Sequence, residues 1–215
     1  MNSTTDLIEK IREPKTPTKN PPLIVLLHGY GSNENDLFSF ADHLPDQYYV
    51  ISYRAPYTIQ PNSYAWYAIH LNELNGKFSD DKQAQNSREL ILDNIQRFSK
   101  KYGILANEVT LIGFSQGAIL SVALGLTYPK SFKKIIALSG YVNDKILKLP
   151  QDLTSLPKFF FSHGSEDQVI PIGWAQQSLN FLKKHHIDYT FKSYPVGHGL
   201  CPENFNDMIN WMEKA

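Results

Sequence analysis

The sequence predicts an α/β fold in which helices cover both faces of a mostly parallel central sheet. Short apolar runs of strand length alternate along the chain with longer segments whose apolar residues recur at helical spacing. The run at residues 23–27 is apolar throughout, which is typical of a strand buried on both faces of a parallel sheet. The chain has 215 residues, enough to bury a sizeable core, and we expect residues 1–215 to form one domain.

Several apolar or alternating runs are expected to form the strands of this sheet. They are residues 23–27, 48–53, 109–112, 134–138, 158–162 and 189–194. The last of them alternates apolar with polar side chains, which favours a position nearer the sheet edge. Residues 13–22 are rich in proline, and we expect them to connect a further edge strand, nearer the N-terminus, to the sheet.

Helical spacing of apolar residues predicts the helices. They are residues 33–44, 79–102, 116–127, 171–184 and 202–213. Ser32 or Asn33 is expected to cap the first helix, and Ser79 or Asp80 the second. Gly103 is expected to end the second, because glycine readily adopts the left-handed conformation found after helices.

Composition excludes several classes of function. Lys and Arg together number 21, as do Asp and Glu, so no strong field favours nucleic acid or an anionic membrane surface. The apolar runs are too short for membrane insertion, and no secretory signal is visible, so a cytoplasmic location is expected. Cys201 is the single cysteine, which excludes an internal disulfide and a cysteine-based zinc site. No metal or cofactor is expected.

Residues 113–117 read Gly-Phe-Ser-Gln-Gly, directly between a predicted strand and a predicted helix. A G-x-S-x-G sequence in that setting is the nucleophile elbow of an α/β-hydrolase. Its glycines allow a tight turn and close packing of the helix on the strand. We therefore predict an α/β-hydrolase fold with Ser115 as the nucleophile. The competing interpretation is a glycine-rich turn with an unreactive serine.

A serine nucleophile needs a base and a group that orients the base, and in this fold they follow in the order Ser, acid, His. His198 lies between two glycines, after the last predicted strand, and is the predicted base. Asp167 follows the strand at 158–162 and is the predicted acid, with Asp144 as the alternative. His163 precedes the acid and is expected to hold its loop.

The third requirement is a pair of backbone N–H groups that face the developing oxyanion. One is expected from Gln116, the residue after the nucleophile. The other is assigned to Tyr30, in the loop His-Gly-Tyr-Gly that follows the buried strand at 23–27. The ring of Tyr30 is separately expected to form a wall of the pocket. A plain glycine turn is the alternative for this loop.

Four segments resemble the phospholipase/carboxylesterase family of small α/β-hydrolases, which includes acyl-protein thioesterases and bacterial carboxylesterases. They are residues 27–37, 113–118, 163–171 and 197–198. The resemblance runs from about residue 20 to the end of the chain. It implies the same catalytic residues: Ser115, Asp167, His198 and the amides of Tyr30 and Gln116.

The resemblance also implies the substrate pocket. Trp66 matches a tryptophan that commonly borders the active site, and Val169 and Ile170 match apolar positions on the acyl side. The aspartate that often follows this tryptophan is absent here. The family lacks a large lid domain, and this length leaves no room for one. Residues 54–78 are expected to be irregular. Within them, the aromatic-rich segment 57–78 either covers the acyl chain as a flap or packs on the sheet.

The predicted function is a serine carboxylesterase that hydrolyses short- to medium-chain esters through an acyl-enzyme. An acyl thioesterase or a lysophospholipase would use the same triad. A peptidase of this superfamily usually adds a cap domain, and a dienelactone-hydrolase-type enzyme would have cysteine in place of Ser115. A non-catalytic binding module is the remaining alternative. The expected partner is a small ester or thioester, and the resemblance leaves both a monomer and a homodimer open.

Overall fold

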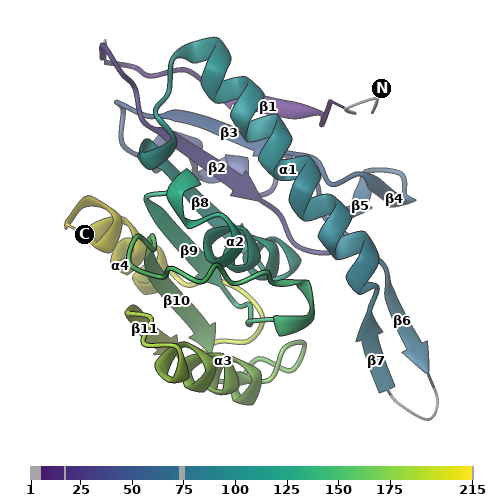
Figure 1. Ribbon diagram of the computed structural model, residues 1–215. Helices are drawn as coiled ribbons and strands as arrows, with labels where there is room; N and C mark the ends of the chain where they lie inside the picture. Colours follow the sequence, from purple (N-terminus) through teal and green to yellow (C-terminus); the bar gives the residue numbers. More distant parts are fainter. Residues whose placement is uncertain (1–5, 17, 73–75, 215) are drawn as a thin grey trace.

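A central sheet organises the computed structural model, which describes residues 6–16, 18–72 and 76–214 (Figure 1). Within that part of the chain seven strands form the sheet, in the order β1-β3-β2-β8-β9-β10-β11. All neighbours are parallel except β1 and β3, so the mostly parallel sheet is confirmed, as is the N-terminal edge strand. The strands are β1 (Glu9–Arg12), β2 (Leu23–Leu27), β3 (Tyr49–Tyr53), β8 (Val109–Phe114), β9 (Lys134–Leu138), β10 (Lys158–Gly164) and β11 (Tyr189–Tyr194).

Strand β2 shows why the apolar runs are continuous. Leu23, Val25 and Leu27 join the core on one face of the sheet, whereas Ile24 and Leu26 join the core on the other. Successive side chains of a strand point to opposite faces, so a strand covered on both sides needs apolar residues at every position. Full burial of each such side chain stabilises the fold by about 1.5–3 kcal/mol.

Helices cover both faces of the sheet, as predicted (Figure 1). Apolar side chains of α1 (Asp81–Tyr102), α2 (Gln116–Thr127) and α3 (Ile172–Lys184) pack in the core on one face. Those of α4 (Pro202–Lys214) and of the 3-10 helix η1 (Leu37–His43) pack on the other. No helix in the described part of the chain is long and apolar enough to cross a membrane. Three shorter 3-10 helices are η2 (Ala106–Glu108), η3 (Pro129–Ser131) and η4 (Asp144–Ile146).

Both ends of α1 follow the sequence prediction. The side chain of Asp80 accepts a hydrogen bond from the backbone N–H of Gln83 at 2.9 Å and so caps the first turn. Gly103 ends the helix in the left-handed conformation, with φ of 67°. Ile91 and Ile95 are buried against the sheet, which fixes the helix along one face of the core.

The helix predicted over residues 33–44 is shorter than expected, and its predicted cap is wrong. The structure has only the 3-10 helix Leu37–His43, without a side-chain cap. Ser32 instead forms a β-bridge with Tyr64, and the Asn33 side chain accepts the N–H of Asn35 in a separate turn. Pairing with a distant strand therefore overrides the local capping preference of Ser32, and Asn33 caps a local turn instead of the helix.

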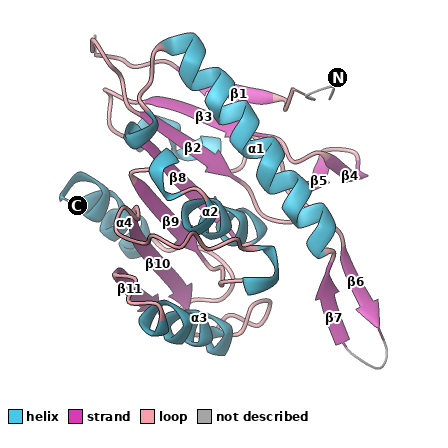
Figure 2. Cartoon of the chain, viewed as in Figure 1, coloured by secondary structure: helices cyan, strands magenta, loops and turns pink. Residues whose placement is uncertain are grey.

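The prediction that residues 54–78 are irregular is also wrong, because the segment forms two hairpins (Figure 2). One pairs β4 (Tyr57–Gln60) with β5 (Ser63–Ala65), and the other pairs β6 (Ile69–Asn72) with β7 (Gly76–Ser79). These strands are three or four residues long and lack a long apolar run, so the sequence gives little signal for them. The side chain of Phe78 lies outside the part of the chain that the structure describes.

Candidate active site

Ser115 lies at a sharp turn between β8 and α2. Its backbone has φ of 54° and ψ of −117°, a conformation that non-glycine residues rarely adopt, and its N–H donates to the carbonyl of Leu138 at 2.9 Å. A Cβ at Gly113 would lie 2.3 Å from the oxygen of Gly117, and one at Gly117 would lie 1.9 Å from the oxygen of Leu27. Both glycines are therefore required by close backbone approach, as an elbow demands.

Asp167 and His198 are in contact at the carboxyl ends of the strands. The Oδ2 atom of Asp167 lies 2.7 Å from Nδ1 of His198. Its Oδ1 atom accepts the backbone N–H groups of Val169 and Ile170, both at 2.9 Å. Because a carboxylate can only accept, Nδ1 of His198 carries the proton and Nε2 is left as the basic nitrogen. Asp144, the alternative acid, is exposed in η4.

His163 holds the loop of Asp167, as predicted. Its Nε2–H donates to the carbonyl of Ile170 at 2.7 Å, and the same nitrogen lies 3.3 Å from Oδ2 of Asp167. The ring of Phe114, the residue before the elbow serine, packs on His198 with centroids 4.9 Å apart. These contacts fix both the carboxylate and the imidazole that it orients.

Ser115 and His198 line the same cavity, which has a volume of about 180 Å³. It lies where loops follow the carboxyl ends of the parallel strands, the expected place for a ligand in such a sheet. Tyr30, Val169 and Ile170 belong to its lining. The full lining consists of Tyr30, Tyr67, Ile69, Ser79, Ser115, Gln116, Ile119, Tyr141, Val169, Ile170, Trp174 and His198.

Trp66 does not belong to that lining but lies behind it, fully buried. Its indole N–H donates to the carbonyl of His28 at 2.9 Å, and its backbone N–H donates to Oε1 of Gln116 at 3.0 Å. The Gln116 amide in turn donates to the carbonyl of Tyr67 at 2.7 Å. This role of the Gln116 side chain is not among the sequence predictions. The sequence signal that could have indicated it is a side-chain amide at a position that the elbow buries.

The loop after β2 runs beside Ser115. A Cβ at Gly29 would lie 3.2 Å from Cβ of Ser115, so the backbone that leads to Tyr30 touches the elbow. The buried ring of His28 fixes this loop, because Nδ1–H donates to the carbonyl of Gly29 at 2.7 Å and Nε2 accepts the N–H of Ala55 at 3.0 Å. Burial lowers the pKa of His28, an effect that the bond to Gly29 partly opposes.

An ion pair holds the next part of the same loop. Two nitrogens of Arg54 donate to the two carboxylate oxygens of Glu34, each at 2.6 Å, and this bond lowers the pKa of Glu34. The Arg54 guanidinium also lies 4.6 Å from the ring centroid of Tyr64. The carbonyl of Tyr64 accepts the N–H of Gly31 at 2.8 Å. The loop is thus anchored to hairpin β4–β5 by backbone and side chains.

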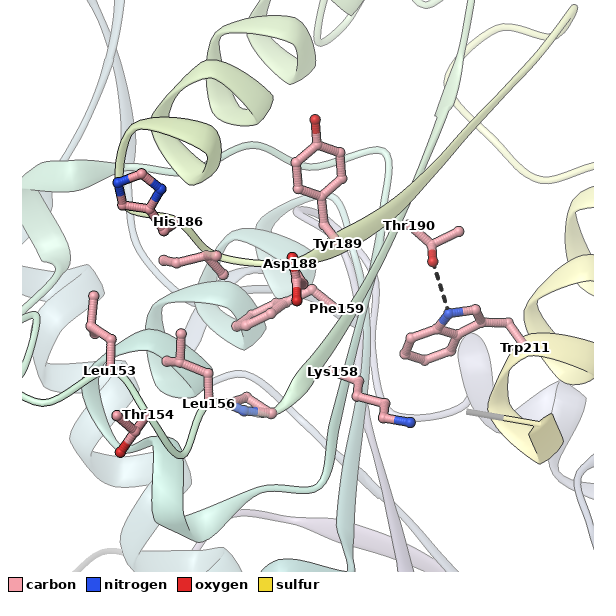
Figure 3. Close-up of a pocket in the computed structure, with 12 residues that line it drawn as sticks. Leu153, Thr154, Leu156, Lys158, Phe159, His186, Asp188, Tyr189, Thr190 and Trp211 are labelled. Carbon is pink, nitrogen blue, oxygen red and sulfur yellow. Dashed lines mark hydrogen bonds between the residues drawn. The ribbon is translucent and has the colours of Figure 1, made fainter.

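A larger cavity of about 450 Å³ lies at the opposite end of the sheet, beside the amino ends of β10 and β11 (Figure 3). Lys158 and Asp188 contribute to its lining, and the indole N–H of Trp211 donates to the hydroxyl of Thr190 at 3.1 Å. Neither Ser115 nor His198 belongs to the lining of this larger cavity. The smaller cavity, which both residues line, is therefore the candidate active site. Among the described residues, no cluster of three His, Cys, Asp or Glu side chains could hold a metal ion.

The parallel sheet, the strained elbow serine and the carboxylate-bound histidine at one end of the strands define an α/β-hydrolase. The family model described as Phospholipase/Carboxylesterase matches residues 7–215. The chain therefore belongs to the phospholipase/carboxylesterase family, and it is a hydrolase of the carboxylic ester class.

Relatives over the full length agree with this membership. Acyl-protein thioesterase 1 of Cryptococcus neoformans is 26% identical over 217 residues, which cover 89% of this chain and 91% of the relative. Acyl-protein thioesterase 1 of Kluyveromyces lactis is 27% identical and covers 93% of each chain.

Solved structures show the same fold. Esterase PE8 superposes with a TM-score of 0.84 at 24% identity, over 98% of this chain and 99% of that one. The carboxylesterase of Bacillus cereus superposes with a TM-score of 0.82 at 21% identity, over 99% and 95%. The predicted α/β-hydrolase fold is confirmed.

Proposed function

We propose that the chain is a serine carboxylesterase that hydrolyses short- to medium-chain carboxylic esters through a triad of Ser115, His198 and Asp167. The observation that carries the proposal is the 2.7 Å contact of Asp167 with His198, which lines the same cavity as the strained Ser115. The carboxylate holds the imidazole in the tautomer that a general base needs. No metal or cofactor takes part in this chemistry.

The reaction proceeds in two halves. The hydroxyl oxygen of Ser115 attacks the ester carbonyl while Nε2 of His198 takes the hydroxyl proton. The backbone N–H groups of Tyr30 and Gln116 stabilise the resulting oxyanion. Collapse of this intermediate expels the alcohol, which receives the proton from His198. Water then attacks the acyl-enzyme with His198 again as base, which releases the carboxylic acid and restores Ser115.

The lining of the cavity supports an apolar acyl group. Aromatic and aliphatic side chains, among them Tyr67, Ile119 and Ile170, form most of the wall around Ser115. A cavity of about 180 Å³ favours a short or medium acyl chain over the long chain of a lysophospholipid.

An acyl thioester is the second candidate substrate. Two full-length relatives are named acyl-protein thioesterases, and thioester hydrolysis needs the same nucleophile, base and oxyanion donors. The two substrate classes differ in the leaving group that receives the proton from His198. An ester releases an alcohol, whereas a thioester releases a thiol. A parallel series of acyl thioesters therefore belongs in the same experiment.

The test is hydrolysis of p-nitrophenyl esters from acetate to palmitate, with matched acyl thioesters, by the native chain and by Ser115→Ala. We expect ester hydrolysis that the variant abolishes while its circular dichroism and melting temperature stay unchanged. Ser99→Ala is the matched control, since Ser99 lies on α1 away from the cavity, and it should retain full activity. Unchanged hydrolysis by Ser115→Ala would refute the assignment.

A further inference from the structure

We propose that the rings of Tyr141 and Trp174 close the far end of the active-site cavity and so limit the length of the acyl chain. The inference rests on the proposed ester hydrolysis and adds the residues that set its chain-length selectivity. Both side chains line the cavity that contains Ser115. Their rings meet edge to face, with centroids 5.0 Å apart and planes at 84°. This is a favourable aromatic geometry that holds the two rings against each other, although Trp174 stays 40% exposed.

A second cavity, of about 510 Å³, lies on the other side of this wall. The two cavities share Ser79, Tyr141 and Trp174, so these side chains form the partition between them. The character of the lining changes at the partition. Beyond it the walls are largely polar, with Asp81, Asn143, Asp144, Lys145 and Gln177 among the lining residues. We call this second cavity the polar groove.

The partition is fixed by hydrogen bonds of Ser178, a buried residue of α3. Its hydroxyl donates to the carbonyl of Trp174 at 2.9 Å and accepts the backbone N–H of Val142 at 2.8 Å. One side chain thereby ties the helix turn that carries Trp174 to the residue after Tyr141. The two rings come from segments far apart in sequence, and this link sets their relative position.

The partition has a direct consequence for substrate selection. An acyl chain that fits between Ser115 and the rings is removed from water by apolar side chains, and each buried CH₂ group favours binding. A longer chain must displace the rings or pass into the polar groove, where that gain is lost. We therefore expect kcat/KM of the native enzyme to peak at a short acyl chain and to fall for longer ones.

The experiment compares p-nitrophenyl acetate, butyrate, hexanoate, octanoate and palmitate on the native chain and on Trp174→Ala. Removal of the indole joins the two cavities, so the optimum should move to a longer chain. The ratio of kcat/KM for octanoate to that for acetate should rise about tenfold or more, the usual scale of discrimination by a hydrophobic pocket. Trp174→Leu is a second variant that keeps an apolar side chain without the ring, and it should move the optimum in the same direction.

Phe181→Ala is the matched control. Phe181 lies two turns along α3 and lines the polar groove but not the active-site cavity, so its removal should leave the ratio unchanged. An unchanged ratio in both Trp174 variants, or a native enzyme equally active on acetate and palmitate, would overturn the partition while the esterase assignment stands. A native chain inactive on every ester would overturn the proposed function, and the partition with it.

Discussion

The indole N–H of Trp66 donates to the backbone carbonyl of His28 at 2.9 Å. His28 lies two residues before Tyr30, in the loop proposed to supply one oxyanion donor. The backbone N–H of Trp66 donates to the side-chain oxygen of Gln116. The backbone N–H of Gln116 is the other proposed oxyanion donor. One buried tryptophan therefore connects the two segments that are proposed to converge on the oxyanion, and it fixes their separation.

Substitution Trp66→Phe should lower kcat while KM changes little. Phenylalanine keeps an aromatic ring in the buried site but removes the donor to His28, so the loop before Tyr30 loses one of its anchors. Loss of a whole oxyanion donor costs about 10²–10³-fold in kcat, and we expect a displaced donor to cost about tenfold or more. Steady-state kinetics with the best ester measures this effect. A rise in KM at constant kcat would contradict it, because that pattern indicates lost substrate binding.

Substitution Asp167→Asn should reduce kcat by about 10⁴-fold. The amide nitrogen that replaces one carboxylate oxygen donates to Nδ1 of His198, which forces the imidazole into the tautomer that cannot accept the Ser115 proton. Asp144→Asn is the matched control, since Asp144 is the alternative acid, follows the preceding strand and is exposed in η4. It should keep native activity. If the larger loss occurs in Asp144→Asn, the acid has been assigned to the wrong residue.

The buried ring of His28 should make stability fall as pH decreases below about 6.5. Its pKa is lowered in the folded state, so below the unfolded value the unfolded chain binds more protons. The slope from this one group approaches about 1.4 kcal/mol per pH unit. The bond that Nε2 accepts from Ala55 requires the neutral ring. Nearby Glu34 raises the pKa of His28, and Arg54 lowers it.

The measurement is the free energy of unfolding in urea at about pH 7.5 and about pH 5.5, for the native chain and for His28→Gln. Glutamine retains an oxygen that can accept the Ala55 N–H but does not titrate. The variant should lose less stability over this interval than the native chain loses. Equal losses in the two proteins would show that His28 does not contribute to the pH dependence.

Substitution Gly117→Ala should unfold the chain or abolish its activity. The added Cβ would lie 1.9 Å from the carbonyl oxygen of Leu27, so either α2 or the strand before Tyr30 must move. Gly173→Ala is the matched control, because nothing lies within 4 Å of the added Cβ and the position is helical. It should raise stability by up to about 1 kcal/mol. Thermal melting of both variants tests the comparison, and a native-like Gly117→Ala enzyme would contradict it.

The fold was predictable where local pattern and tertiary environment agree. The apolar run of β2 predicts a doubly covered strand, and Asp80 and Gly103 predict the ends of α1. The prediction failed for residues 33–44 and 54–78, where the backbone pairs with partners distant in the chain. Ser32 binds Tyr64 across more than thirty residues, and no local pattern reveals that choice.

The predicted strands of the central sheet and the helices α1 to α4 follow from apolar patterns along the chain. The candidate nucleophile, acid and base follow from residue type beside a strand end. The contacts that support these residues appear only in the folded chain. The tertiary structure places Trp66 behind the cavity, gives the Gln116 side chain two backbone partners and brings Tyr141 against Trp174. These contacts join segments that are far apart in the chain, and their geometry follows from the packing of the whole core. A motif read along the chain carries no information about such distances.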